Sequence, residues 1–196
     1  MLDTEGTIVD AGVWRDGGVG WELHSSSILP SPEDCTAAFC VAITRHGKIV
    51  LAREERGWGM IGGHIEDHET IEQALVRECL EEGGFIVTSP VLFGYRKIIA
   101  SQPVAHPTPG KAYPFPVSYI AYYYATTDKE LSVPTEREVL EIREFTIEQI
   151  ITLGIPDCST IKLGWECHLS ELTQGKKIPW RNDRFFNRRL GESQIR

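Results

Sequence analysis

Residues 63–85 read Gly63-His-Ile-Glu-Asp-His-Glu-Thr-Ile-Glu-Gln-Ala-Leu-Val-Arg-Glu-Cys-Leu-Glu-Glu-Gly-Gly-Phe85, or G-x5-E-x7-R-E-U-x-E-E-x-G-U, where U is an apolar residue. From Thr70 to Glu82 this stretch has no Gly or Pro and is rich in helix-forming residues, so it predicts an α-helix. Gly83 and Gly84 should end the helix, because glycine accepts the left-handed conformation that closes one.

Three glutamates share one side of the predicted helix. Glu78 is four residues from Glu82 and three from Glu81, and both spacings bring side chains onto one face. Like charges so placed destabilise an isolated helix by roughly 0.2–0.5 kcal/mol per pair, and a bound cation would relieve this repulsion. Carboxylate oxygens are the ligands that Mg2+ and Mn2+ prefer, so the glutamate cluster (Glu78, Glu81 and Glu82) predicts a metal site. A second, apolar face that can pack on a sheet is formed by Ile71, Ala74 and Leu75.

A solvated acidic helix face is the other interpretation of this cluster, and it would be preferred for an isolated E-x-x-E-E. Three further features favour the metal site: the pair Gly62-Gly63 before the helix, Glu69 at its start and Arg77 beside the cluster. Glu69 also has a purely structural interpretation, because negative charge stabilises a helix N-terminus by itself.

Over its full 23 residues the stretch resembles the signature of the Nudix hydrolases, with every charged and glycine position filled. The resemblance implies an enzyme that uses Mg2+ or Mn2+ to cut a diphosphate linkage, usually in a nucleotide derivative. It implies metal ligands at the carbonyl of Gly62 and at the side chains of Glu78, Glu81 and Glu82. Arg77 and Glu69 are expected to orient these carboxylates through a salt bridge and hydrogen bonds, which completes the expected catalytic set.

Two positions depart from the usual family pattern. Ile61 stands where proline is common, and Cys79 fills the apolar position after Arg77 and Glu78. Neither position supplies an expected ligand, so the expected catalysis is unaffected, and Cys79 should behave as a small buried hydrophobe.

The composition indicates one compact enzyme. The chain has 196 residues, of which 41% are hydrophobic and 24% charged, as in ordinary globular domains. No stretch approaches the roughly 20 apolar residues that span a bilayer, and the first residues lack the features of a signal peptide. Five cysteines without a C-x-x-C pair argue against a zinc site or a disulfide framework. We therefore expect a cytoplasmic protein with no membrane partner.

Charge is distributed unevenly along the chain. The net charge of −8 argues against nonspecific binding to nucleic acid. Residues 176–196, by contrast, hold seven basic and two acidic residues. This basic tail could cover a neighbouring acidic surface, the simpler interpretation, or help to hold substrate phosphates. We divide the chain into an N-terminal extension (1–34), a catalytic domain (35–172) and the basic C-terminal tail (173–196); a homodimer is compatible with the sequence.

The pattern of apolar runs predicts strands around the helix. An α/β fold follows: an α/β/α sandwich of the Nudix type with a mixed sheet, an N-terminal extension and a C-terminal helix. We expect a loop at 58–65 and helices at 147–153 and 160–172. The expected strands span residues 19–23, 36–44, 49–53, 85–88, 91–100, 117–125 and 139–145.

Three side chains outside the signature are candidates for binding substrate. Trp58 lies just before Gly62 and could stack on a base. Glu136 and Glu138 precede an expected strand, where family members often place a further carboxylate; an exposed charged turn is the alternative. The loop 101–116 holds five prolines, and its length suggests a substrate-facing element.

The expected reaction is attack of an activated water on a phosphorus of a diphosphate bridge. One carboxylate accepts the proton, and Glu78, Glu82, Glu136 and Glu138 are all candidates. We expect a small nucleotide as substrate, a nucleoside triphosphate or a nucleoside diphosphate derivative, without specifying which. The alternatives are a non-catalytic nucleotide-sensing module and an isomerase of prenyl diphosphates.

Overall fold

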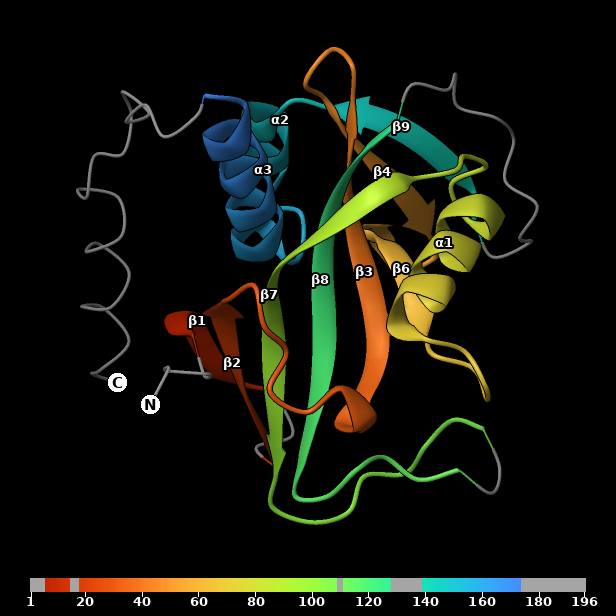
Figure 1. Ribbon diagram of the computed structural model, residues 1–196, viewed down its shortest axis with the longest axis vertical. Coiled ribbons are helices and arrows are strands. Elements are labelled where there is room, and N and C mark those ends of the chain that lie inside the picture. Colours follow the sequence, from red (N-terminus) through yellow and green to blue (C-terminus); the bar gives the residue numbers. More distant parts are fainter. Residues whose placement is uncertain (1–5, 15–17, 109–110, 128–138, 174–196) are drawn as a thin grey trace.

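The computed structural model describes residues 6–14, 18–108, 111–127 and 139–173, in which one mixed sheet carries helices on both faces (Figure 1). The strands are β1 (Thr7–Val13), β2 (Val19–Ser25), β3 (Cys35–Thr44), β4 (Ile49–Glu54), β5 (Gly57–Gly59), β6 (Ile61–His64), β7 (Thr88–Ala100), β8 (Val117–Thr127) and β9 (Glu141–Phe145). The helices are α1 (Ile71–Glu81), α2 (Ile147–Leu153) and α3 (Cys158–Leu172), with a 3-10 turn at Pro32–Asp34. The predicted α/β fold with a mixed sheet is confirmed.

The sheet is organised around two parallel strands, β3 and β8, and all its other pairings are antiparallel. The order is β1-β2-β7-β8-β3-β4-β5, with β6 paired to β3 and β9 paired to β4. The apolar run of β3 suits this central place, because a strand covered on both faces needs apolar side chains on both.

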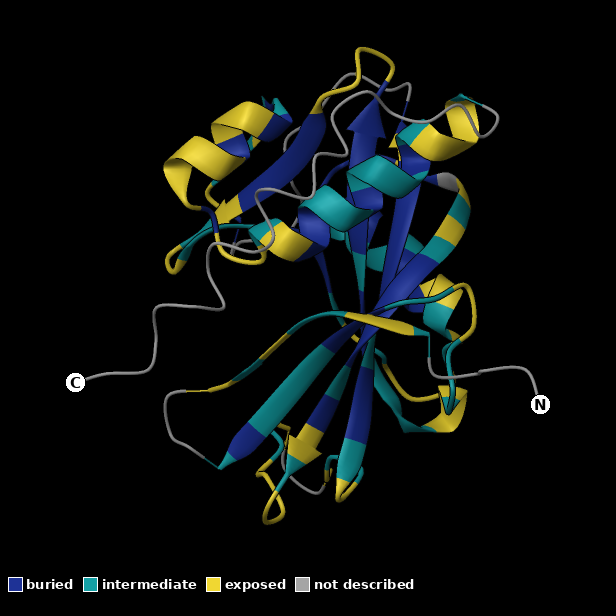
Figure 2. Cartoon of the chain, turned by 90° about the vertical axis from the view of Figure 1, so that its left-hand side faces the viewer, coloured by how far each residue is buried: buried dark blue, intermediate teal, exposed yellow. Residues whose placement is uncertain are grey.

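Two apolar cores fill the two faces of the sheet. Leu75, Cys79 and Phe85 from α1 and its C-terminal turn are fully buried against alanines of β3 and β8. On the opposite face Ile150 of α2 and Ile161 of α3 are fully buried over the sheet. Figure 2 shows buried central strands beneath helices whose outer surfaces are exposed.

The N-terminal residues join this sheet. β2 pairs with β7 from Val19 opposite Ala100 to Ser25 opposite Gly94, and β1 pairs with β2 as an edge strand. The division of the chain at residue 34 stays a prediction. Residues 174–196 of the basic tail lie outside the described residues.

Two expected segments differ from the structure. The expected loop at 58–65 holds most of β5 and all of β6, because pairing with β4 and β3 extends a backbone whose glycines carry no strand signal. Residues 85–87 are not a strand: the N–H of Phe85 donates to the carbonyl of Cys79 and closes α1, and β7 begins only at Thr88.

Capping fixes both ends of α1. The hydroxyl of Thr70 accepts from the N–H of Gln73, whose side chain accepts in turn from the N–H of Thr70. At the other end Gly84 takes a left-handed φ of 65°.

Among the described residues, no helix has both the length and the apolar character that crossing a membrane requires.

Candidate active site

The site is built where α1 passes over β6. The helix buries Ala74, Leu75 and Cys79 against the sheet, which turns its charged side toward the end of β6 and the loop that follows. The strand pairs with β3 through Gly62 opposite Phe39, so its position relative to the helix is set by the sheet. Helix and strand together define the candidate site.

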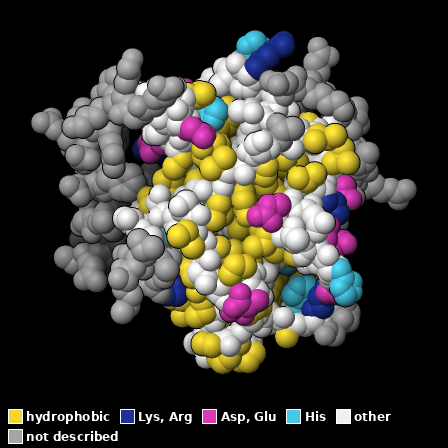
Figure 3. All heavy atoms as spheres, viewed as in Figure 1, with side chains coloured by type: hydrophobic (Ala, Val, Ile, Leu, Met, Phe, Trp, Pro, Cys, Tyr) yellow, Lys and Arg dark blue, Asp and Glu magenta, His cyan; other side chains and the backbone are white. Residues whose placement is uncertain are grey.

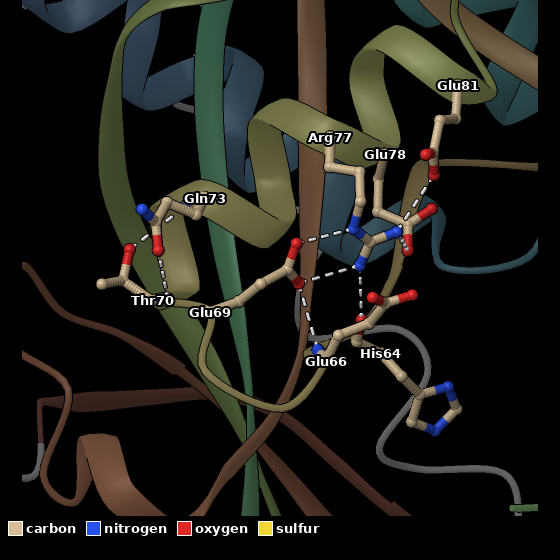
Figure 4. Close-up of polar contacts among 8 residues, drawn as sticks. All are labelled: His64, Glu66, Glu69, Thr70, Gln73, Arg77, Glu78 and Glu81. Atoms are coloured by element: carbon tan, nitrogen blue, oxygen red, sulfur yellow. Dashed lines mark hydrogen bonds and ion pairs between the residues drawn. The ribbon is translucent and has the colours of Figure 1, made fainter.

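Arg77 is the centre of the polar network (Figure 4). Its Nε and Nη2 donate to the two carboxylate oxygens of Glu69 at 2.7 and 3.0 Å. Its Nη1 donates to Glu78 at 2.9 Å and to Glu81 at 3.1 Å, and Nη2 also donates to the carbonyl of His64 at 3.0 Å. A planar guanidinium suits this geometry, because it offers several donors in one rigid fork.

Glu82 contacts β6 directly. Its Oε2 accepts a hydrogen bond of 3.0 Å from the backbone N–H of Gly62. Gly62 has a φ of +144°, and a Cβ at this position would collide with the carbonyl oxygen of Ala38. A Cβ on Gly63 would lie 2.5 Å from a carboxylate oxygen of Glu78. The paired glycines therefore let the glutamates of α1 approach the strand.

The carboxylates of the site differ in their electrostatics. Hydrogen bonds from Arg77 lower the pKa of Glu69 below its usual value. Burial raises the pKa of Glu78 despite the same arginine. Burial, reinforced by Glu78 and Glu54, raises the pKa of Glu82 to about 7, against the opposing bond from Gly62. Glu78 and Glu82 are thus the carboxylates of the site whose ionisation is disfavoured by burial.

These residues fit a divalent cation in chemistry, because their side-chain donors are all carboxylate oxygens. Among the described residues, no three His, Cys, Asp or Glu side chains converge on one point as a ready metal cage. Glu78 and Glu82 each use one oxygen for a hydrogen bond, to Arg77 and Gly62 respectively, and no donor among the described residues occupies the other. Mg2+ is commonly held by only one or two carboxylates, with water and substrate phosphates completing its shell.

The other predicted site residues are Trp58, Glu136 and Glu138. Trp58 lies in β5, where its ring packs edge-on against Phe145 at 4.9 Å and lies near the guanidinium groups of Arg53 and Arg143. A role for Trp58 in binding substrate stays a prediction. Glu136 and Glu138 lie outside the described residues.

The sequence did not single out His64 and Tyr113 as partners. The ring of His64 hydrogen-bonds the hydroxyl of Tyr113 at 2.8 Å, while its carbonyl is the oxygen that Arg77 holds. Burial, with His106 and Lys111 nearby, lowers the pKa of His64. Only the proline-rich loop 101–116 hinted at this contact, because the two residues are 49 apart in sequence.

A cavity of about 340 Å³ borders β6 on the side of Gly63 and His64. We call it the Tyr113 cavity; aromatic residues in its wall are Trp14, Phe39, His64 and Tyr113. On the face shown in Figure 3, the described basic side chains are few and dispersed among apolar and acidic ones.

Comparison with known proteins supports the family resemblance of the sequence. A model of the NUDIX domain matches residues 34–159. The chain is 32% identical over 132 residues to the NAD-capped RNA hydrolase NudC of Vibrio cholerae, and 30% identical over 120 residues to that of Shigella dysenteriae. These matches cover 65% and 59% of this chain but only 41% of either relative, so the chain spans less than half the length of these relatives.

Among solved structures, the fold is similar to the crystal structure of the Bacillus subtilis pyrophosphohydrolase BsRppH. The TM-score is 0.56 at 19% identity, and the match covers 87% of this chain and 99% of the other. At this identity the likeness concerns the fold alone.

Proposed function

The chain belongs to the Nudix family, and from this premise we propose that it is a metal-dependent hydrolase of diphosphate linkages. Its substrate would be a nucleoside diphosphate derivative or a nucleoside triphosphate. The observation that carries the proposal is the arrangement of α1 on β6: Arg77 ties Glu69, Glu78 and Glu81 together, while Glu82 meets Gly62.

The groups that would hold the metal are Glu78 and Glu82, with Glu81 and the carbonyl of Gly62 as further ligands. Bound Mg2+ or Mn2+ would neutralise charge on the phosphoryl oxygens and make water a better nucleophile. The choice of a hard cation follows from the donors, which are all oxygen atoms.

The residues of the chain would position the carboxylates and accept the proton. Arg77 holds Glu78 and Glu81 at fixed directions, and Glu69 holds Arg77 through two bonds, which is a positioning role. A carboxylate accepts a proton as the oxygen of water bonds to phosphorus and the bridging P–O bond breaks. The bridging oxygen leaves with the second product, so the products are two phosphate compounds. The candidates for the proton acceptor are Glu78, Glu82, Glu136 and Glu138.

The relatives suggest which further substrates should be tested. The proteins from Vibrio cholerae and Shigella dysenteriae are hydrolases of NAD-capped RNA, and NAD joins two nucleosides through a diphosphate. We therefore include dinucleotides and capped RNA, although net charge −8 gives the chain no general attraction to RNA.

A product-release screen tests the proposal. Wild type and Glu82→Gln are compared, with Mg2+ and with Mn2+, on nucleoside triphosphates, ADP-ribose, nucleotide sugars, NAD, dinucleoside polyphosphates and capped RNA. We expect turnover of at least one class by the wild type and its loss in the variant. Ligand binding without turnover across the panel, by both proteins, would instead support a nucleotide-sensing module.

A further inference from the structure

A second polar cluster lies beside the candidate active site, where the loop 101–116 meets the end of β6. It consists of His64 from β6 and three side chains of the loop, His106, Lys111 and Tyr113, and we call these four residues the loop cluster. The ring centroids of His64 and His106 are 5.4 Å apart, and those of His106 and Tyr113 are 4.7 Å apart. On the face shown in Figure 3, histidine side chains gather with basic and acidic ones at the lower right.

A short pairing within the loop explains why its three side chains share one side. Ala105 pairs with Ala112 in an antiparallel bridge. The next two residues toward the tip, His106 and Lys111, therefore stand opposite each other. Tyr113 is two residues from Lys111, which places both on the same side of an extended backbone. The contact between the rings of His106 and Tyr113 agrees with this arrangement.

The two histidines and the tyrosine present hydrogen-bond donors that no described residue uses. The Nδ1 atom of His106 accepts from the N–H of Thr108 at 2.9 Å, so the neutral ring carries its hydrogen on Nε2. The neutral ring of His64 and the hydroxyl of Tyr113 have two hydrogens between them, and their mutual bond of 2.8 Å uses only one. Whichever group donates in that bond, the other keeps a donor for a ligand.

Lys111 adds a positive charge that is weakly neutralised. Its ammonium group pairs with the carboxylate of Asp67 at 2.9 Å, and the two side chains are 35% and 76% exposed. Ion pairs so exposed contribute little stability, so another anion can compete for the lysine. Burial lowers the pKa of His64, and His106 and Lys111 lower it further, so the charge of the lysine reaches the ring of His64. Free donors beside a positive charge suit an anion.

The end of β6 connects the loop cluster to the glutamates of α1. The carbonyl of His64 accepts from Arg77 at 3.0 Å, while its ring points away from that guanidinium (Figure 4). A Cβ on Gly63, the preceding residue, would lie 2.5 Å from a carboxylate oxygen of Glu78. Within the described sheet β6 pairs with β3 alone, so its other edge has no strand partner. A chain of phosphates along this edge can reach the glutamates and the loop cluster together.

We propose that the loop cluster binds a phosphate of the substrate beyond the two at the glutamates, so that the preferred substrates are nucleoside triphosphates or dinucleoside polyphosphates. This assignment rests on the proposed hydrolase function and names its substrate class. Lysine binds phosphate as a point charge, and hydrogen bonds from the rings and the hydroxyl add direction. ADP-ribose, NAD and nucleotide sugars carry only two phosphates, so they leave the loop cluster to water. An RNA chain offers phosphate as well and forms a separate arm of the test.

Non-hydrolysable methylene analogues of ADP and ATP measure the preference without turnover. Each is titrated with Mg2+ into the full chain, and calorimetry gives its Kd. We expect wild type to bind the ATP analogue about tenfold to a hundredfold more tightly than the ADP analogue, since a hydrogen bond to a charged group contributes to that extent. In the double variant Lys111→Gln, His106→Ala the two analogues should bind alike, with the Kd of the ADP analogue unchanged. Equal binding of both analogues by wild type, or a preference that survives in the double variant, would overturn the proposal.

Lys48→Gln is the matched control. Lys48 is also an exposed lysine in an ion pair, with Glu144 at 3.4 Å, but it lies at the turn between β3 and β4. The control should keep the preference for the ATP analogue. Melting temperatures check the fold of each variant, and Lys111→Gln alone, at an exposed position, replaces the double variant if that protein does not fold. Equal loss of the preference in Lys48→Gln and Lys111→Gln would reveal an effect of net charge and contradict the assignment.

Cleavage of capped RNA tests the other source of phosphate. The kcat/KM of Lys111→Gln is compared with that of wild type on NAD-capped RNA and on free NAD. We expect no change that is specific to the RNA. If the variant cleaves only the capped RNA more slowly, and its affinities for both analogues are those of wild type, then the loop cluster binds the RNA chain and the polyphosphate assignment is wrong.

The two proposals fail differently. If the ATP analogue binds through the loop cluster but no substrate of the panel is cleaved, then the hydrolase proposal fails. If ADP-ribose or NAD is cleaved with a higher kcat/KM than any triphosphate or dinucleoside polyphosphate, and Lys111→Gln changes none of these values, then the hydrolase proposal stands and the assignment of the loop cluster fails.

Discussion

The backbone N–H of Gly62 donates a hydrogen bond of 3.0 Å to the carboxylate of Glu82, twenty residues further along the chain. This bond joins the strand β6 to the C-terminal end of α1. It places a half-buried carboxylate beside a backbone position where only glycine fits. The geometry of the site therefore depends on backbone packing as much as on the charged side chains.

Substitutions at Gly62 and Gly57 should separate the cost of a steric clash of the added Cβ from the cost of a positive φ. In Gly62→Ala the added Cβ meets backbone atoms of Ala38 and Phe39, which cannot move aside cheaply. Gly57 also has a positive φ, +118°, but nothing lies within 4 Å of a Cβ there. Gly57→Ala should lower the free energy of unfolding by about 1–3 kcal/mol through backbone strain alone, and Gly62→Ala by distinctly more. Urea unfolding measures both; equal costs would refute the close approach of β6 to β3.

Arg77→Lys should damage the site while preserving its charge. Lysine cannot reproduce the bidentate bond to Glu69 together with the bonds to Glu78 and Glu81. Loss of such an orienting group typically costs roughly 10–100-fold in metal affinity or activity. Mn2+ titration followed by EPR, together with kcat, measures the loss. Arg45→Lys, at an exposed turn after β3, is the matched control; an unchanged Mn2+ affinity in Arg77→Lys would contradict the positioning role.

Glu69→Gln and Glu82→Gln should change stability in opposite directions in the metal-free protein. The pKa of Glu69 is lowered on folding, so its ionised form stabilises the fold above its unfolded pKa, and that contribution is lost as the pH falls through the folded pKa. The pKa of Glu82 is raised to about 7, so its ionisation destabilises the fold increasingly between the unfolded pKa, near 4.5, and about 7.

The pH dependence of the melting temperature in EDTA distinguishes these two carboxylates. Glu69→Gln should melt below wild type by a nearly constant amount from pH 5.5 to pH 8. Glu82→Gln should melt above wild type by an amount that grows as the pH rises from 5 to 7.5. Adding Mg2+ should raise the melting temperature of the wild type more than that of Glu82→Gln. A stabilisation of Glu82→Gln that shrinks with rising pH would show that the charge at Glu82 is already compensated.

The ion pair between the buried Arg96 and the exposed Asp157 should show an asymmetric cost of substitution. The Arg96 side chain is 11% exposed and donates to Asp157, which is 41% exposed, at 2.7 Å. Asp157→Asn would remove the ion-pair partner of a buried guanidinium; because Asp157 is itself 41% exposed, the cost should lie below the roughly 3–5 kcal/mol of a fully buried pair. Arg96→Met leaves the exposed partner in water instead, so it should cost less despite the lost contacts with Trp21 and Tyr122.

A double-mutant cycle with thermal unfolding checks this asymmetry. Asparagine tolerates the left-handed backbone of Asp157, whose φ is 59°, so the substitution probes charge and not strain. The double variant should be no less stable than Asp157→Asn alone. A larger loss in Arg96→Met than in Asp157→Asn would mean that the ring contacts outweigh the ion pair.

Local sequence predicted the parts of the site that lie on one helix. The spacing of Glu78, Glu81 and Glu82 and the stop at Gly83 and Gly84 need only helix geometry, and α1 was found at 71–81 within the predicted 70–82. The family resemblance itself is confirmed by the matched NUDIX domain.

Features that depend on distant pairing could not be predicted in the same way. β6 is a strand because β3 lies beside it, and its sequence around Gly62-Gly63 carries no strand preference. The bond between His64 and Tyr113 spans 49 residues and arises only when the loop 101–116 folds back on the segment before α1. For that reason the aromatic residue that the sequence favoured was Trp58, while the cavity is lined by Trp14, Phe39 and Tyr113.

The most direct test of the account is 31P NMR of one dinucleotide diphosphate, NAD or the best substrate of the screen, mixed with wild type or Glu82→Gln, in Mg2+ and in EDTA. We predict that the diphosphate signals give way to monophosphate signals only with wild type and Mg2+. Cleavage at an equal rate in EDTA, or by Glu82→Gln, would contradict the claim that the carboxylates of α1 hold a catalytic metal.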